Sequence, residues 1–256
     1  LFNIKLVLGL HSNLPWINFS KMPGSILRNY ITKLIMQLSI YSSDHLIVTS
    51  NTAKNEIIKI LSLKRDKVSY VYLGVDEKFL KLEQQNKNFI KNFDYKDYIL
   101  SVLSCVKYHN IINLLKAFKS LLKENNLKFK FVLVMQILDK IYYKEIIKFI
   151  DNNFNDGQII IFSNLKNSYL INLYKNANFY IFSSDCEVFG LTSLEAMSQN
   201  CPVIISNKSS LPEINSSAAE YFDPDDENQI KICMKKLMKN NNYKKKLIKT
   251  GQEHIK

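Results

Sequence analysis

Two glutamates, Glu187 and Glu195, stand eight residues apart in the stretch FSSDCEVFGLTSLEAMSQNCPVIIS, residues 182–206. An apolar strand is expected to end near Ser183, and Gly190 is expected to open a helix that carries Glu195. Glu187 would then lie in the loop at the mouth of this helix, with Glu195 one turn inside it. The spacing therefore predicts two carboxylates beside the same helix N-terminus.

The start of this helix also offers hydrogen-bond donors. The amides of Phe189, Gly190, Leu191 and Thr192 are the first of the helix and have no partner within it. Together with the positive end of the helix dipole they form an anion site, and the Glu195 carboxylate can accept both vicinal hydroxyls of a ribose. The layout predicts a nucleotide-diphosphate ligand. Taken alone, two glutamates at this spacing are also typical of solvated surface acids.

The elements that must position these residues follow from short apolar runs that alternate with longer amphipathic stretches. We expect strands over 4–11, 45–50, 68–73, 98–103, 129–135, 158–162, 179–182 and 202–206. We expect helices near 23–42, 51–62, 110–124, 140–153, 167–177, 191–199 and 226–239. Apolar strands separated by amphipathic helices predict a parallel sheet covered on both faces, so the fold class is α/β. Ligands of such sheets bind at the carboxyl ends of the strands.

One polar stretch interrupts this alternation. Residues 80–97 follow YLGVDEKF, are rich in Asn, Gln and Lys, and are interpreted as a hinge or linker. They separate residues 1–79, the C-terminal part of a first domain, from residues 98–256, a domain-sized second part. The first part is too short to close a core by itself. Because the chain begins with Leu1 and shows no leader pattern, we interpret it as a fragment or a trimmed chain.

The composition is that of a soluble globular protein. Of the 256 residues, 46% are apolar and 23% charged, which excludes a disordered or collagen-like chain. No apolar run approaches the roughly 18 residues of a membrane-spanning helix. The four cysteines are widely spaced and form no CxxC pair, so they are interpreted as reduced thiols and predict a cytoplasmic protein.

The net charge of +12 is concentrated at one end of the chain. Residues 231–256 hold nine lysines and one acid, Glu253, and so carry +8 of the +12. Lysine supplies 33 of the 35 basic residues, which leaves few planar guanidinium groups for phosphate or guanine. Three interpretations stay open: a solvated helix face, peripheral contact with an anionic membrane or acceptor, and nucleic-acid binding. The scarcity of arginine favours the first two, and no nucleic-acid partner is expected.

The motif EVFGLTSLEAM, followed by CPVI and LPEI, resembles the signature of the retaining glycosyltransferases of family 4, the group 1 glycosyltransferases. Further segments resemble this family in order: SDHLIVTSNTAKNEI, the hinge VSYVYLGVDEKF and the donor-domain start YILSVLSCVKYHNIINLLKAF. The resemblance implies a GT-B fold. The second part would be its Rossmann-like, nucleotide-sugar-binding domain, and the first part the remnant of its acceptor-side domain.

The resemblance also implies an activity, the transfer of a hexose from a nucleotide-diphosphate sugar to a hydroxyl acceptor with retention. The acceptor would be a glycan, a lipid-linked sugar or a small molecule. Glu195 would bind the donor ribose, Glu187 would sit beside the transferred hexose, and the amides of Phe189 to Leu191 would hold sugar hydroxyls and phosphate. His11, in LGLHSNLPW, would face the donor sugar across the cleft. The nucleotide sugar is a co-substrate, and neither a cofactor nor a metal is expected.

The chain departs from the family pattern where the diphosphate should bind. The family usually places an arginine and a lysine after the first strand of the donor domain, and here those positions are Ser104 and His109. Lys107 and His109 would share the charge, although neither is a planar fork. Glycines that are usual in the family are also replaced, by Leu103, Met135, Val188 and Asn200. These departures leave a second interpretation open, a catalytically impaired nucleotide-sugar-binding module, and the fragment alone is not expected to turn over.

Overall fold

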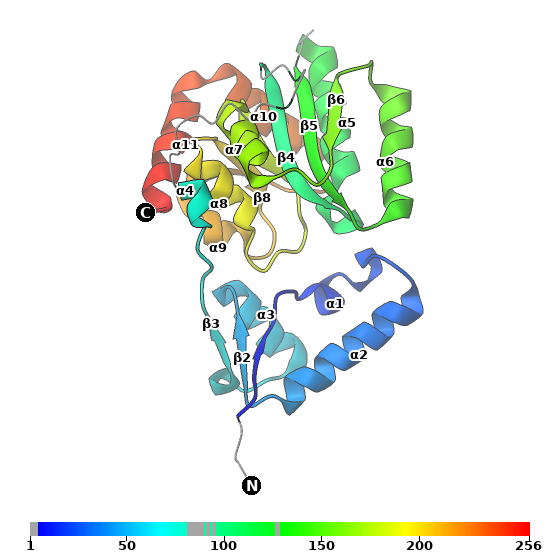
Figure 1. Cartoon of the computed structure of the whole chain (residues 1–256), viewed down its shortest axis with the longest axis vertical. Helices are drawn as coiled ribbons and strands as arrows, with labels where there is room; N and C mark the ends of the chain where they lie inside the picture. The colour runs from blue at the N-terminus through cyan, green and yellow to red at the C-terminus, as the bar shows by residue number, and fades with distance from the viewer. Residues whose placement is uncertain (1–4, 81–89, 91–92, 94–95, 126–128) are drawn as a thin grey trace.

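The computed structural model describes residues 5–80, 90, 93, 96–125 and 129–256, which form two α/β units around separate parallel sheets (Figure 1). The first sheet has the order β1-β2-β3, with β1 (Val7–Gly9), β2 (His45–Val48) and β3 (Val68–Tyr70). Its helices are α1 (Leu14–Ile17), α2 (Ile26–Ser42) and α3 (Asn51–Leu61), with 3-10 turns η1 (Phe19–Lys21) and η2 (Arg65–Lys67). A small core of aliphatic side chains from α2, β2, α3 and β3 fills the space between them.

The second sheet has six parallel strands in the order β6-β5-β4-β7-β8-β9. The strands are β4 (Tyr98–Cys105), β5 (Lys130–Ile137), β6 (Ile159–Phe162), β7 (Phe179–Phe182), β8 (Val203–Ser206) and β9 (Ala219–Phe222). Every residue of β7 and β8 is buried, as expected for strands covered on both faces. The chain proceeds outward from β4 to β6 and then returns to β7 on the other side of β4. This reversal opens a crevice at the carboxyl ends of β4 and β7.

Helices cover both faces of the second sheet (Figure 1). They are α5 (Ile111–Asn125), α6 (Lys140–Asn153), α7 (Asn167–Asn176), α8 (Leu191–Ser198), α9 (Leu211–Asn215), α10 (Glu227–Lys239) and α11 (Asn241–His254). The short α4 (Glu77–Leu80) precedes the sheet in the chain, and the 3-10 turns are η3 (Lys107–His109) and η4 (Ser216–Ala218). Side chains fix several starts: Asp139 accepts the amides of Ile141 and Tyr142, and Asp226 those of Asn228 and Gln229.

The α/β class and the parallel sheets are confirmed, and several details differ from the sequence-based expectations, among them the short helices α1 and α4. Of the strand expected over 4–11, only Val7–Gly9 pairs within the described residues. The strand β9 and the helix α11 were not predicted. Most of the expected linker over 80–97 lies outside the described residues, although its first residue closes the short helix α4.

Among the described residues, no helix is both long enough and apolar enough to cross a membrane.

Candidate functional site

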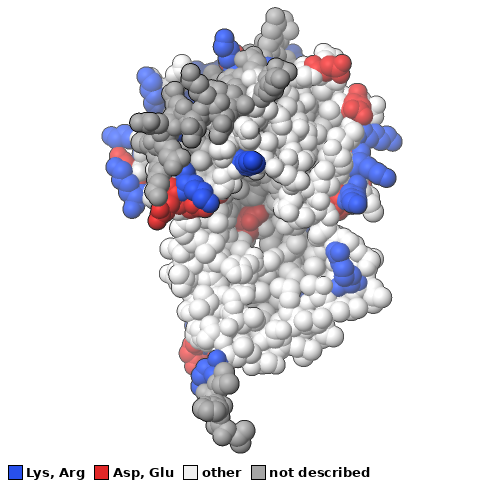
Figure 2. All heavy atoms as spheres, viewed as in Figure 1, with Lys and Arg blue, Asp and Glu red and all other residues white. Residues whose placement is uncertain are grey.

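A cavity of about 540 Å³ lies between the carboxyl ends of the two sheets. Figure 2 shows it as a hollow between the two parts of the molecule. The first sheet contributes His11, Thr49 and Leu73, which follow β1, β2 and β3 respectively. The second sheet contributes the ends of β4, β5 and β7 and the segment that leads into α8. The cavity therefore lies at the crevice that the strand order predicts.

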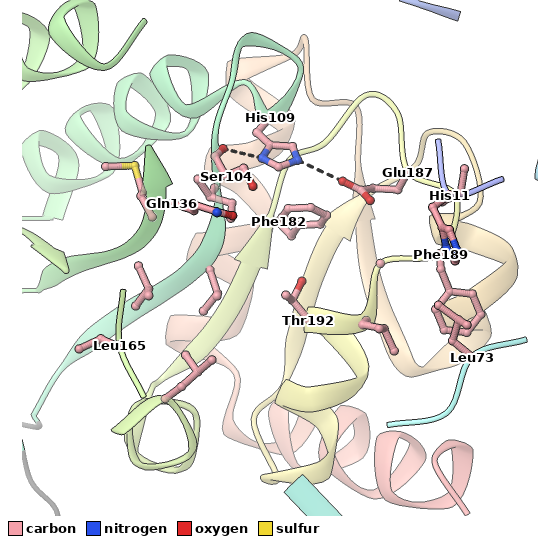
Figure 3. A pocket seen from close by; sticks show the side chains of 18 of the residues that line it. His11, Leu73, Ser104, His109, Gln136, Leu165, Phe182, Glu187, Phe189 and Thr192 are labelled. Carbon is pink, nitrogen blue, oxygen red and sulfur yellow. Dashed lines mark hydrogen bonds and ion pairs between the residues drawn. The ribbon is translucent and has the colours of Figure 1, made fainter. Parts of the chain in front are cut away.

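Glu187 and His109 form the polar centre of the cavity (Figure 3). The Glu187 carboxylate lies 3.1 Å from Nε2 of His109, and Nδ1 of the same ring lies 2.7 Å from the backbone carbonyl of Ser104. Because a carbonyl oxygen only accepts, Nδ1 carries a proton, and Nε2 donates to Glu187 when the ring is an imidazolium. The pair thus places an imidazole ring and a carboxylate side by side, and Figure 3 shows Glu187 between His109 and His11.

A network of amides and hydroxyls holds this centre in place. Asn110, in left-handed conformation with φ +49°, donates to the Ser183 carbonyl at 3.1 Å and to the Asp185 carboxylate at 2.6 Å. The Ser183 hydroxyl donates to the carbonyl of His109 at 2.5 Å. Lys21, from η1 of the other unit, forms an ion pair with Asp185. The turn η3 and the loop after β7 are thereby fixed to each other and to the first unit.

Gly190 makes the sharp entry into α8. Its φ is +89°, and a Cβ at this position would lie 2.6 Å from Cδ2 of Leu211, so the site accommodates glycine alone without strain. Within the described part of the chain, the amides of Gly190, Leu191 and Thr192 donate no hydrogen bond, and these three residues line the cavity. The start of α8 therefore presents free donors and the positive end of a helix dipole to whatever fills the cavity.

Glu195 lies one turn further along α8 and is not among the residues that line the cavity. Its carboxylate accepts a hydrogen bond from the hydroxyl of fully buried Tyr174 at 3.2 Å. Burial raises the pKa of Glu195 above its ordinary value, although the Tyr174 hydroxyl opposes the shift and the nearby charge of Asp76 adds to it. The two glutamates thus occupy different environments, one open to the cavity and one largely enclosed.

The far end of the cavity was not anticipated from the sequence. It is lined by Val134, Leu165 and Leu170, by the carboxamide of Gln136 near the end of β5, and by that of Asn164, which follows β6. Gln136 and Asn164 are exposed, so their side chains are free to bind a ligand. An apolar wall with carboxamides at its edge is suited to a flat, hydrogen-bonding ring. Glutamine and asparagine at strand ends are common, and this signal is too weak to find by spacing alone.

The residues predicted for the site divide into two groups. Those that line the cavity are His11, Ser104, His109, Glu187, Phe189, Gly190, Leu191 and Thr192. Lys107 is exposed and Glu195 lies deeper, and neither belongs to the lining. None of the described lining residues is a lysine or an arginine, so its basic side chains are the two histidines. Within the described residues, no three His, Cys, Asp or Glu side chains are arranged to hold a metal ion.

The chain matches two family profiles that together span nearly all of it. The profile of "Glycosyl transferases group 1" matches residues 82–254, and that of "Glycosyltransferase Family 4" matches residues 1–79. The O-antigen chain mannosyltransferase RfbU of Salmonella typhimurium is 24% identical over 92% of this chain and 65% of that protein. The serotype-specific mannosyltransferase WbdA of Escherichia coli is 25% identical over 91% of this chain and 29% of that protein. An uncharacterized glycosyltransferase of Methanocaldococcus jannaschii is 28% identical over 69% of this chain and 46% of that protein.

Solved structures share the fold at low sequence identity. Sucrose-phosphate synthase from Thermosynechococcus elongatus superposes with a TM-score of 0.80 at 18% identity, over 99% of this chain and 63% of that one. An α,α-trehalose-phosphate synthase from Burkholderia xenovorans gives a TM-score of 0.76 at 12% identity, over 98% and 64%. The architecture is the GT-B fold of these enzymes. The chain spans about two thirds or less of the length of these relatives. Because the profile of the group 1 glycosyltransferases matches more than half of it, the chain belongs to that family.

Proposed function

We propose that the protein transfers a hexose from a nucleotide-diphosphate sugar to a hydroxyl group of a glycan or lipid-linked acceptor. The configuration at the anomeric carbon is retained, and mannose is the first hexose to test. The choice of mannose follows the names of RfbU and WbdA. The observation that carries the proposal is the cavity between the two sheets, where free amides of α8 lie beside the pair of Glu187 and His109.

The geometry supports a division of labour among these groups. The diphosphate lies on the amides of Gly190 to Thr192, where the helix dipole and hydrogen bonds favour negative charge. The His109 ring, held by the Ser104 carbonyl at Nδ1 and by Glu187 at Nε2, lies beside the leaving group. Glu187 orients that ring and the hexose, and Glu195 receives the ribose hydroxyls. Gln136 and Asn164 contact the base. The proposed site needs neither a metal nor a cofactor.

The reaction then depends on positioning more than on a strong base. As the glycosidic bond to the phosphate breaks, negative charge develops on the leaving oxygen, and the incoming hydroxyl on the same face gives its proton to that oxygen. The new bond forms on the face from which the diphosphate departs, so the configuration is retained. His11 faces the same space from the other unit and limits where the acceptor enters. The protein supplies orientation and charge stabilisation.

A second candidate is a catalytically impaired nucleotide-sugar-binding module. It is favoured by one observation, the absence of lysine and arginine from the described cavity lining. The two candidates separate when the intact protein is incubated with GDP-mannose, UDP-glucose or UDP-N-acetylglucosamine and an alkyl mannoside as the hydroxyl acceptor. Release of the nucleotide, and an unchanged anomeric configuration of the product by proton NMR, support the transferase. Saturable binding without release supports the module, and no binding at all contradicts both.

A cytoplasmic location with peripheral membrane contact is also a proposal. Among the lysines of residues 231–256, Lys231 and Lys235 pair with Glu124 and Lys236 pairs with Glu220. The exposed lysines of α11 would contact an anionic membrane surface; they are Lys245, Lys246 and Lys249. Co-sedimentation with vesicles containing phosphatidylglycerol should fall when these three are replaced by glutamine. Equal sedimentation of both proteins would exclude this surface.

A further inference from the structure

A glutamate of the second unit caps a helix of the first. Glu213, in α9, accepts the amide of Asn51 at 2.8 Å on Oε1 and the amide of Thr52 at 2.6 Å on Oε2. The hydroxyl of Tyr72, in the segment that leaves β3, donates to Oε1 at 2.9 Å. All three donors belong to the first unit or its exit, so one carboxylate joins the two units by three hydrogen bonds.

These contacts satisfy groups that α3 cannot satisfy by itself. The side chain of Ser50 accepts the amide of Ala53 at 3.1 Å, which leaves the first amides of the helix in need of an acceptor. A carboxylate that spans two adjacent amides at the positive end of a helix is a strong cap. Burial raises the pKa of Glu213, but the hydrogen bonds from Thr52, Asn51 and Tyr72 together lower it below its ordinary value.

The residues just before Glu213 hold the loop that carries Glu187. The hydroxyls of Ser209 and Ser210 donate to the carbonyl of Glu187 at 2.8 and 2.6 Å. Leu211 packs against Gly190 at the entry to α8. Residues 209–213, hereafter the interdomain bracket, therefore contact α3 with one end and the polar centre of the cavity with the other.

A second contact runs parallel to this one. The hydroxyl of Thr49, at the end of β2, donates to the carbonyl of Val188 at 3.0 Å. The segment that enters α3 thus contacts the residue next to Glu187, while Glu213 holds the first turn of the same helix. His11, Thr49 and Leu73 reach the cavity only when the two units lie in this arrangement.

We propose that the interdomain bracket holds the first unit closed over the Glu187 loop, and that Glu213 is the positioning residue on which this closure depends. Closure itself follows from the contacts of Glu213. Its effect on sugar transfer rests on the proposed function, because it is closure that places His11 opposite Glu187. Glu213 touches none of the reacting atoms in this scheme.

The test measures the distance between the units in the intact protein without any nucleotide. Dyes are attached to Lys59→Cys on α3 and Lys140→Cys on α6, both exposed positions. The four native thiols are buried, and burial raises the pKa of Cys105, Cys186 and Cys233 to about 12, so they compete little for the label. Single-molecule energy transfer then gives the closed-to-open ratio.

Glu213→Gln should lower the closed-to-open ratio by about tenfold, as expected for the loss of a charged helix cap. Tyr72→Phe, which removes one of the three hydrogen bonds at an exposed position, should lower it by about two- to fivefold. Glu213→Asp keeps the charge and should recover part of the ratio. The matched control is Glu227→Gln, which removes the charge of a glutamate paired with Lys116 inside the second unit and should change nothing.

An unchanged ratio in both Glu213→Gln and Tyr72→Phe, with circular dichroism like that of the parent, would overturn the proposal. Should Glu213→Gln fail to fold, Tyr72→Phe decides alone. A titration with GDP-mannose follows as a separate readout, in which Glu213→Gln should weaken binding by the same factor as the closed fraction falls. If the parent binds no nucleotide sugar, the proposed function fails while the nucleotide-free distances still test the bracket.

Discussion

Glu187 and Glu195, the two glutamates of the sequence motif, lie in different surroundings. Glu187 faces the cavity and is paired with His109, whereas Glu195 is largely buried against Tyr174. Their spacing of eight residues predicted that both lie beside the start of α8, and they do. Spacing does not reveal the raised pKa of Glu195, because that shift depends on burial, on the Tyr174 hydroxyl and on the charge of Asp76, which lies far away in the chain.

Replacing Glu195 by glutamine should stabilise the fold at pH 7. Burial raises the pKa of Glu195, so between its ordinary and raised values the native state binds more protons than the unfolded state. The free energy of unfolding therefore decreases as the pH rises through this interval, and the cost of the buried charge is greater at pH 7 than at pH 4. Glu195→Gln removes that cost and keeps an acceptor for Tyr174, which raises Tm by about 2–4 °C per kcal/mol recovered.

Thermal melts at pH 7 and pH 4 check this prediction. The gain should shrink at pH 4, where the parent's Glu195 is largely protonated, and the exposed Glu253→Gln should show no gain at either pH. A Tm at pH 7 equal to or below that of the parent would contradict the cost that burial implies.

Among the elements, the apolar strands were the most predictable and the polar ones the least. The strands β4, β7 and β8 are nearly continuous apolar runs, and each was expected close to its observed place. The strand β9 is four residues long and contains Glu220, whose carboxylate is bound by Lys236 and Tyr243 at the sheet edge. A charge held by a neighbouring helix is invisible to a search for apolar runs.

The helix α11 was missed for a related reason. Most of its residues are polar, and it contributes only Leu247 and Gly251 to the buried set. Gly251 permits close packing, since a Cβ there would lie 3.2 Å from Cγ of Met197 in α8. The helix is held by close backbone approach to α8 and by a narrow inward face of Tyr243, Leu247 and Gly251, spaced four residues apart. So narrow a face is difficult to recognise among many polar residues.

The entry to α8 gives a prediction at the scale of the element. Gly190→Ala places a Cβ at a positive φ and against Leu211, so we expect a loss of about 2–4 kcal/mol in the free energy of unfolding. Gly157→Ala is the matched control, because Gly157 also has a positive φ, +78°, but has nothing within 4 Å of the added atom. It should cost about 1 kcal/mol.

Chemical denaturation of both variants measures the difference between them. A nucleotide-sugar titration adds a second comparison, since only Gly190→Ala displaces the free amides at the start of α8. Equal losses of stability for the two glycines would show that the contact with Leu211 carries no cost. Unaltered ligand binding in Gly190→Ala would argue against the role assigned to these amides.

The contacts between the two units belong to the whole molecule and lay beyond sequence reasoning. Glu213 is an acid in the first turn of its own helix, α9. Its carboxylate nevertheless binds the amides of α3, more than 160 residues earlier in the chain. Lys21 and Asp185 are similarly distant. Only the orientation of the two sheets brings such pairs together.

The first unit also presents an unusually apolar surface. Large apolar side chains of α2 are exposed, among them Leu34 and Leu38 at 58% and 56%, and Figure 2 shows few charges over this unit. A contiguous exposed patch of this kind promotes association in water. Leu34→Lys with Leu38→Lys should therefore reduce the average mass found by light scattering at high concentration.

A matched pair of substitutions tests whether loss of the apolar patch, and not the added positive charge, causes the decrease in association. Ile141 and Ile232 are at least as exposed, at 72% and 60%, but lie on α6 and α10 of the second unit. Lysine at these two positions should leave the average mass where it was. The same decrease from both pairs would attribute the effect to net charge.

The central claim is that a nucleotide sugar binds between the two sheets, at the start of α8. Calorimetric titration of the intact protein with GDP-mannose, UDP-glucose and ADP-glucose tests it most directly, with Glu195→Ala and the exposed Glu253→Ala as paired variants. We predict saturable binding of one of these sugars, weakened about 10- to 100-fold by Glu195→Ala through loss of a charged acceptor and unchanged by Glu253→Ala. Absence of binding by all three sugars, or equal affinity of parent and Glu195→Ala, would contradict the account.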